Sequence, residues 1–281
     1  MDTRPVTVTD ISGRKNSGEK ITALTAYDYS FAKLLDATDL DIILVGDSLG
    51  MISLGHENTL AVTMQNMIDH TRAVKQGAKR ALVVSDMPFM SYQVSVEQAV
   101  TNAGRLIQEG EASSVKLEGG ARMADRVQAI VRAGIPVMGH IGLTPQSVHQ
   151  FGGYKVQGKN YLDSRQIKQD ARDLQNAGIF ALVLEGIPGE LAEEITAELK
   201  IPTIGIGAGV KCDGQILVLH DLLGLNQDFV PKFVKQYANL ADLMKNAVAE
   251  YIDDVRSKAF PGQEHTYLSK QGNLKQVKNG S

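Results

Sequence analysis

The stretch Asp41-Ile42-Ile43-Leu44-Val45-Gly46-Asp47-Ser48 is an apolar run of strand length that ends in a carboxylate and a hydroxyl. The same arrangement returns further along the chain, and each time the run closes on a side chain able to do chemistry. The other runs are residues 81–86, 114–118, 136–140 and 181–185. Near-continuous apolar strands are typical of a parallel sheet covered by helices. The repetition therefore predicts one architecture with its reactive groups gathered at one rim.

Helical segments alternate with these strands. Apolar residues recur at helical spacing between the strands, for example after Ser95, and Gly110 and Gly178 are placed to end such helices. Strand-helix alternation repeated about eight times predicts an α/β fold, a closed (β/α)8 TIM barrel in a single domain, for which roughly 250 residues is typical. An open doubly wound sheet is the alternative, but it concentrates its reactive groups at one switch point.

The proposed barrel occupies residues 20–261 as the catalytic domain. Residues 1–19 are polar and rich in turn formers, and this composition predicts a mobile or lightly docked N-terminal arm. Residues 262–281 are a polar tail that we expect to be disordered. Residues 240–255 have the pattern of a long helix. Residues 215–220 are either the eighth strand or a helix, because the connection before them is too short for a crossover helix.

Composition narrows the function classes. The formal net charge is -3, and no basic block carries interleaved aromatics, so we expect no nucleic-acid partner. The start lacks the layout of a signal peptide, and no stretch of about 18 apolar residues occurs, so we expect a soluble cytoplasmic protein with no membrane partner. A lone Cys212 fits a reducing compartment, and we assign it no chemical role.

Three carboxylates end consecutive predicted strands: Asp47, Asp86 and Glu118. The carboxyl ends of barrel strands share one rim, with neighbouring strands about 4.8 Å apart. Carboxylates so close repel one another unless a cation neutralises them, and an all-oxygen set favours magnesium before manganese. The alternative is that each acid caps the following helix. Three acids on adjacent strands favour the metal site.

Lys116 lies two residues before Glu118, so both side chains point to the same side of the strand. A lysine inside a barrel must be paired. It either contacts an anionic substrate, such as a carboxylate, or forms a salt bridge with Glu118 or a neighbour.

His140 and Glu185 end the next two strands, and we place them across the rim from the carboxylates. Glu185 is suited to act as a general base, since partial burial would raise its proton affinity; the alternative is an acid at a helix N-terminus. His140 either donates a hydrogen bond to a substrate oxygen or is a structural histidine. The glycines of Gly205-Ile206-Gly207-Ala208-Gly209 suggest either a phosphate cradle or close packing in a tight turn.

Several blocks occur together and in a fixed order. They are Thr25-Ala26-Tyr27-Asp28, Val45-Gly46-Asp47-Ser48-Leu49-Gly50-Met51, Asp86-Met87-Pro88-Phe89, Lys116-Leu117-Glu118-Gly119-Gly120, Gly139-His140-Ile141-Gly142-Leu143-Thr144-Pro145-Gln146, Leu184-Glu185 and Gly205-Ile206-Gly207-Ala208-Gly209. Over residues 20 to 260 the chain thereby resembles the ketopantoate hydroxymethyltransferase family. The resemblance implies a barrel similar to the phosphoenolpyruvate mutase and isocitrate lyase group. It also implies transfer of a hydroxymethyl group from 5,10-methylenetetrahydrofolate to 3-methyl-2-oxobutanoate, which gives 2-dehydropantoate for pantothenate and coenzyme A synthesis.

The resemblance also implies roles for individual residues. Asp47 and Asp86 bind Mg²⁺ and, through it, the substrate, while Glu118 completes the metal site directly or through water. Ser48 and Lys116 hold the substrate carboxylate.

For the remaining two residues, the resemblance implies that Glu185 accepts the proton and that His140 contacts a substrate or product oxygen. Members of the family are usually large cytosolic homo-oligomers, often decamers. The alternatives from the same barrel group are a metal-dependent carbon-carbon lyase or mutase acting on a 2-oxo acid and, less favoured, a non-catalytic 2-oxo acid sensor.

Overall fold

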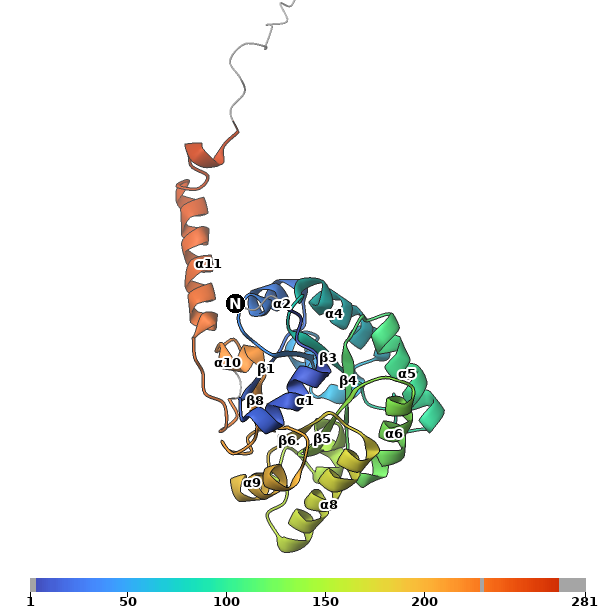
Figure 1. Ribbon diagram of the computed structural model, residues 1–281. Helices are drawn as coiled ribbons and strands as arrows, with labels where there is room; N and C mark the ends of the chain where they lie inside the picture. Colours follow the sequence, from blue (N-terminus) through green and yellow to red (C-terminus); the bar gives the residue numbers. More distant parts are fainter. Residues whose placement is uncertain (1–3, 228–229, 268–281) are drawn as a thin grey trace, which may run out of the picture.

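The computed structural model in Figure 1 describes residues 4–227 and 230–267. Its parallel strands pair in sequence order, and the last strand pairs with the first, so the sheet closes into a barrel. The strands are β1 (Ile21–Thr25), β2 (Ile42–Val45), β3 (Leu82–Asp86), β4 (Ser114–Glu118), β5 (Val137–Gly142), β6 (Ala181–Glu185), β7 (Thr203–Ile206) and β8 (Gly214–Leu217). The predicted (β/α)8 barrel is confirmed, and pairing of β1 with β8 excludes the open sheet.

Helices surround the barrel (Figure 1). The longer ones are α2 (Tyr29–Asp36), α4 (Met64–Gly77), α5 (Val96–Gln108), α6 (Ala124–Arg132), α8 (Tyr161–Ala177) and α9 (Gly189–Glu198). Short helical turns are α3 (Leu49–Ile52), α7 (Val148–Phe151), α10 (Leu219–Leu222), η1 (Thr59–Ala61), η2 (Ala121–Met123), η3 (Pro145–Ser147) and η4 (Gln263–His265). The predicted boundaries hold at two helices. Ser95 Oγ accepts the N–H of Gln98 at the start of α5, and Gly178 ends α8 in the left-handed conformation.

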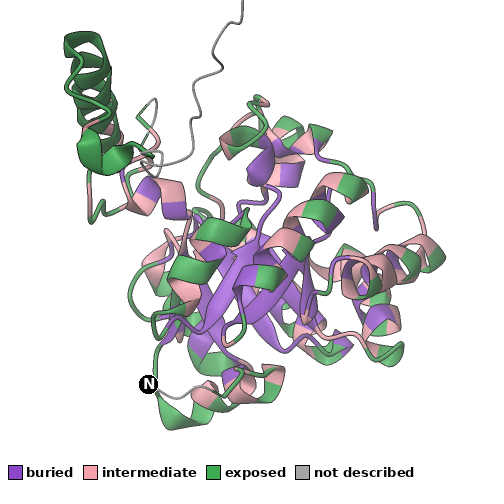
Figure 2. Cartoon of the chain, turned by 90° about the horizontal axis from the view of Figure 1, so that it is seen from above, coloured by how far each residue is buried: buried purple, intermediate pink, exposed green. Residues whose placement is uncertain are grey.

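The core has two parts because successive strand residues point to opposite faces of the sheet. In β2, Ile42 and Leu44 pack inside the barrel, whereas Ile43 and Val45 pack outward under the helices. Figure 2 shows the buried strands at the centre and the exposed outer faces of the helices. The alternation therefore decides which strand residues can reach the barrel interior.

The N-terminal segment differs from the mobile or lightly docked arm predicted for it. Residues 8–17 form helix α1 (Val8–Ser17), which begins with a capping box at Thr7. Ile11 is fully buried and packs with the apolar residues inside the barrel. Arg14 pairs with Asp41 at 3.1 Å, just before β2. The segment is too polar to show helical periodicity in the sequence. Its one buried apolar side chain, Ile11, fills the lower end of the barrel, where the strands begin.

Residues 215–220, for which the sequence allowed either a strand or a helix, contain parts of both. The segment is strand as far as Leu217 and helix from Leu219, because β8 is followed directly by α10. The long predicted helix is also present as α11 (Leu240–Ser257), but it stands away from the barrel and none of its residues is buried (Figures 1 and 2).

Most of the predicted disordered tail, residues 268–281, lies outside the described residues. The division of the chain into arm, catalytic domain and tail stays a prediction. Within the described parts, no helix is both long and apolar enough to cross a membrane.

Candidate active site

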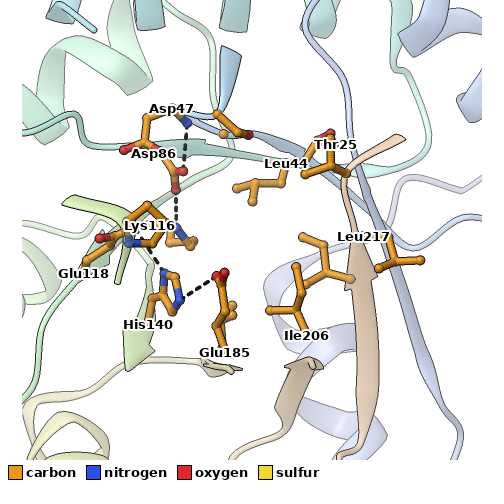
Figure 3. Close-up of a pocket in the computed structure, with 16 residues that line it drawn as sticks. Thr25, Leu44, Asp47, Asp86, Lys116, Glu118, His140, Glu185, Ile206 and Leu217 are labelled. Atoms are coloured by element: carbon orange, nitrogen blue, oxygen red, sulfur yellow. Dashed lines mark hydrogen bonds and ion pairs between the residues drawn. The ribbon is translucent and has the colours of Figure 1, made fainter. Parts of the chain in front are cut away.

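A cavity of about 110 Å³ opens at the carboxyl ends of the strands. It is lined by Thr25, Leu44, Gly46, Asp47, Ser48, Asp86, Lys116, Glu118, His140, Pro145, Val183, Glu185, Ile206, Ile216, Leu217 and Val218. All seven side chains singled out in the sequence are in this set. Figure 3 shows the charged groups on one wall and Leu44, Ile206 and Leu217 on the other. The cavity thus combines a polar and an apolar half.

The three carboxylates come from adjacent strands. Asp47 follows β2, whereas Asp86 and Glu118 end β3 and β4, and their exposed fractions are 3%, 3% and 5%. The backbone N–H of Asp47 donates to Asp86 Oδ2 at 3.0 Å. Burial raises the pKa of Asp47 well above its ordinary value, and the charges of Asp86 and Glu118 raise it further. The carboxylates are therefore close enough to repel one another.

Helix capping does not account for these acids. The helical turns that follow β2, β3 and β4 have Ser48, Ser95 and Gly120 at their N-caps instead. The alternative interpretation of the three carboxylates loses its support.

Lys116 lies among the acids on β4 and is 4% exposed. Its Nζ donates to Asp86 Oδ1 at 2.8 Å, so it forms the salt bridge with a neighbour that the sequence allowed. Burial lowers the pKa of the Lys116 ammonium, but the charges of Asp86, Glu118 and Asp47 outweigh that effect and raise it above its ordinary value. The ammonium therefore stays charged inside the cavity.

His140 lies between two acids. Its Nδ1 is 3.4 Å from Glu118 Oε1, and its Nε2 is 3.1 Å from Glu185 Oε2 (Figure 3). Placing His140 across the rim from the carboxylates was wrong, because β4 and β5 are neighbours and Glu118 pairs in register with His140. These contacts are ion pairs without the alignment of good hydrogen bonds.

The charge of His140 follows from this position. Burial and the Lys116 charge lower the pKa of its imidazole, but the contacts with Glu118 and Glu185 outweigh them and raise it to about 9. The ring is therefore a cation at neutral pH. Glu185 is the more open partner, with its side chain 16% exposed, whereas the Glu118 side chain is 3% exposed. A base that must reach a bound molecule needs such access.

The Ser48 hydroxyl is held by a neighbouring residue, Tyr27, that carries no predicted role. Tyr27, which is 2% exposed, places its hydroxyl 2.8 Å from Ser48 Oγ. Gly46 makes room beside it, since a Cβ there would lie 2.9 Å from Ser48 Oγ. The geometry thus fixes the Ser48 hydroxyl at the cavity wall.

The donor set fits a hard cation. Asp47, Asp86 and Glu118 supply only oxygen, and Glu118 Oε1 is buried without a hydrogen-bond partner. Within residues 4–227 and 230–267, no group of three or more His, Cys, Asp or Glu side chains is placed so that it could hold a metal ion by itself. Magnesium does not require one, because it keeps several waters and takes one or two carboxylates from the protein. Zinc would call for nitrogen or sulfur ligands.

Two further buried residues at this site were missed. Gln146 contacts both Asp47 and Glu118, and Tyr92 contacts Gln146 and the backbone of Glu118. Gln146 stands in one of the sequence blocks quoted above, but Tyr92 follows no strand end and has no signal in the sequence.

The glycine-rich turn after β7 is explained by packing. A Cβ on Gly207 would lie 2.8 Å from the Phe233 ring, and one on Gly205 would lie 3.0 Å from Cys212 Sγ. Residues 207–213 contain no helix whose N-terminus could hold a phosphate. Cys212 is fully buried, and burial raises the pKa of its thiol.

Comparison with known proteins agrees with this geometry. Residues 5–263 match the family model of ketopantoate hydroxymethyltransferase. The 3-methyl-2-oxobutanoate hydroxymethyltransferase of Syntrophus aciditrophicus (strain SB) is 57% identical over 265 residues, 94% of this chain and 97% of the relative. The protein of the same name from Enterococcus faecalis (strain ATCC 700802 / V583) is 60% identical over 253 residues, 90% of this chain and 92% of the relative.

Solved structures share the fold at much lower identity. A phosphonopyruvate hydrolase complex with oxalate and magnesium has a TM-score of 0.60 at 12% identity and covers 94% of this chain and 93% of its own. A 2,3-dimethylmalate lyase of the PEP mutase/isocitrate lyase superfamily has a TM-score of 0.57 at 14% identity and covers 91% and 86%. These likenesses concern the barrel alone. The match over residues 5–263 and the high identity to full-length relatives show that this chain belongs to the ketopantoate hydroxymethyltransferase family.

Proposed function

We propose that the cavity at the top of the barrel transfers a hydroxymethyl group to 3-methyl-2-oxobutanoate, with 5,10-methylenetetrahydrofolate as the one-carbon donor. The protein is a hydroxymethyltransferase of pantothenate biosynthesis, since its relatives at 57% and 60% identity carry that activity by name. The overall reaction takes up one water and yields 2-dehydropantoate and tetrahydrofolate. One observation carries the assignment of the site: acids, an ammonium and an imidazole form one wall, opposite an apolar wall (Figure 3).

The polar wall supplies the binding groups for the 2-oxo acid. Asp47 and Asp86 hold Mg²⁺, with Glu118 completing the site directly or through water. When bound, Mg²⁺ polarises the keto group and offsets the negative charge that develops on the substrate. Lys116 and the hydroxyl of Ser48 hold the substrate carboxylate. The salt bridge between Lys116 and Asp86 keeps the ammonium in place for that contact.

The apolar wall suits the other end of the substrate. Val183, Ile206 and Leu217 line it, and an isopropyl group gains free energy when such a surface removes it from water. C3 is the branch carbon of that isopropyl group, so we place the reacting carbon between this wall and Glu185, which also lines the cavity.

Glu185 acts as the base and removes the C3 proton. The resulting enolate carbon forms the new carbon-carbon bond with the methylene carbon of the folate, and the two bonds from that carbon to the folate nitrogens break. The water taken up supplies the hydroxyl group, and the folate nitrogens take the C3 proton and the remaining proton of the water. His140 lies 3.1 Å from Glu185 and carries a positive charge at neutral pH, so it orients the carboxylate and contacts an oxygen of the substrate or product.

Exchange of the C3 proton tests this role of Glu185. In D₂O with Mg²⁺ and without folate, wild-type protein exchanges the C3 proton of 3-methyl-2-oxobutanoate for deuterium, which proton NMR follows. Glu185→Gln keeps oxo-acid binding but slows exchange by about 10²–10⁴-fold, the usual contribution of a positioned base. Glu190→Gln is a matched control, because Glu190 is exposed in the first turn of α9. Exchange at the wild-type rate in Glu185→Gln would remove Glu185 from the role of base.

A carbon-carbon lyase or mutase is less well supported. The solved lyase and hydrolase share only the barrel, at 14% and 12% identity, whereas the hydroxymethyltransferases share more than half of their residues. A product assay with and without tetrahydrofolate separates building of the bond from its cleavage.

We also propose a cytoplasmic homo-oligomer, of which a decamer is one form. Helix α11 supports assembly because its apolar side chains are exposed, among them Met244, Val248 and Ile252. An apolar helix face left in water is an unusual end state for a folded chain. Sedimentation of the full chain measures the size of the assembly. The lone Cys212 fits a reducing compartment.

A further inference from the structure

Gln146 connects two of the carboxylates that come from different strands. It lies in the turn η3, is 6% exposed, and is 99 residues away from Asp47 in sequence. Its side-chain Nε2 donates to Asp47 Oδ2 at 2.9 Å, and its backbone N–H donates to Glu118 Oε2 at 3.0 Å. One residue thus takes one oxygen of each acid, which leaves Oδ1 of Asp47 and Oε1 of Glu118.

The orientation of the Gln146 amide is determined at both ends. Nε2 faces two acceptors, Asp47 Oδ2 and the Met87 carbonyl, each at 2.9 Å. Oε1 faces two donors, the Tyr92 hydroxyl at 2.7 Å and Gln93 Nε2 at 3.2 Å. A flip of the amide would place its oxygen against two acceptors, Asp47 Oδ2 and the Met87 carbonyl. The amide is therefore held in one orientation, and it holds Asp47 in turn.

We propose that Gln146 is a positioning residue that sets the orientation of the Asp47 and Glu118 carboxylates for a divalent cation. The inference rests on the proposed magnesium site. A hydrogen bond to one oxygen of a carboxylate fixes the rotation of the group and so directs the other oxygen. The bond also offsets part of the repulsion between Asp47 and its neighbours, because it places a donor against a buried negative charge. Gln146 itself contributes no atom to the cation.

Manganese binding measured by electron paramagnetic resonance tests this role without relying on turnover. The probe is Mn²⁺ alone, titrated into the full chain in the absence of oxo acid and folate. Gln146→Met keeps the length of the side chain but removes the amide. We expect the Kd for Mn²⁺ to rise about 10–100-fold, as is typical when a hydrogen-bond partner of a metal ligand is lost.

Gln169→Met is the matched control. Gln169 is exposed on α8, away from the cavity, and its amide donates to Asp173. Its replacement should leave the Kd for Mn²⁺ within about threefold of wild type, and both variants are checked by thermal unfolding in EDTA. If Gln146→Met folds and binds Mn²⁺ as tightly as wild type, the inference is overturned.

Two further measurements keep the outcome decisive. If Gln146→Met does not fold, Tyr92→Phe takes its place, because it removes the hydroxyl that holds Oε1. A rise of about 3–10-fold in Kd supports the inference, and an unchanged Kd overturns it. Asp86→Asn tests the metal site itself. If wild type shows no Mn²⁺ binding that is lost in Asp86→Asn, the proposed metal site fails. If wild type shows such binding and Gln146→Met binds Mn²⁺ equally well, only the proposed role of Gln146 fails.

Discussion

Asp41 and Asp47 lie at opposite ends of strand β2, one just before it and one shortly after it. Both are buried, with exposed fractions of 4% and 3%. Asp41 lies at the lower end of β2, where it accepts the Thr22 N–H at 2.8 Å and pairs with Arg14 at 3.1 Å. Asp47 lies at the upper end, beside Asp86 and Glu118, and burial together with their charges raises its pKa. Equally buried carboxylates therefore have different neighbours at the two ends of one strand: a cation and an N–H donor at Asp41, and further carboxylates at Asp47.

The difference separates the stabilising end of the barrel from its reactive end. At the lower end, α1 brings a cation to Asp41 and an apolar plug, Ile11, to the interior. At the upper end, like charges are gathered, and Lys116 and His140 neutralise them only in part. Barrel enzymes place their active sites at the carboxyl ends of the strands, and the repulsion stored there is what a bound cation can relieve.

The largest expected effect comes from Asp47→Asn. We expect kcat/KM to fall by about 10²–10³-fold, the usual cost of losing one electrostatic contact at a reacting centre. Without metal, however, the free energy of unfolding should rise, because the substitution removes a buried charge that its neighbours repel. Steady-state kinetics and urea unfolding in EDTA measure the two quantities. A loss of stability in EDTA would contradict the comparison.

The same substitution at the other end should have the opposite sign. Asp41→Asn removes the charge that Arg14 and the Thr22 N–H require, and we expect the free energy of unfolding to fall by about 1.5–3 kcal/mol. The catalytic constants of the folded enzyme should stay the same, since Asp41 lies at the far end of β2. Urea unfolding and kinetics below the unfolding transition check this. A change in kcat or KM would show that the two ends are coupled.

The smallest expected effect concerns the pH dependence of stability at the upper end. The pKa of His140 is raised from 6.5 to about 9 in the folded protein, so its contribution is fully present below pH 6.5 and is lost as the pH rises through 9. In EDTA, we expect the stability difference between wild type and His140→Gln to shrink by about 1–2 kcal/mol between pH 6.5 and 8. Unfolding curves across this range measure it; a constant difference would mean that His140 is neutral throughout.

Much of the fold could be predicted because strand and helix signals are local. The apolar run that ends in Asp47 indicates a strand from only a few neighbouring residues, and the repetition of such runs predicts a barrel. The site residues at strand ends followed from the same logic, since the carboxyl ends of parallel strands meet at one rim. The N-terminal helix was missed because a single apolar residue, Ile11, shows no periodicity and gains its burial only from the finished barrel.

The partners of the site residues depend on contacts between distant parts of the chain. Gln146 reaches Asp47 across 99 residues, Tyr27 reaches Ser48 from the loop after β1, and His140 lies beside Glu118 because β4 and β5 are adjacent. Sequence by itself determined the barrel, the family and the set of side chains that meet at the cavity, because these follow from local periodicity and short motifs. Only the tertiary structure decided which charge neutralises which, because pairing depends on the closure of the barrel and on the loops above it.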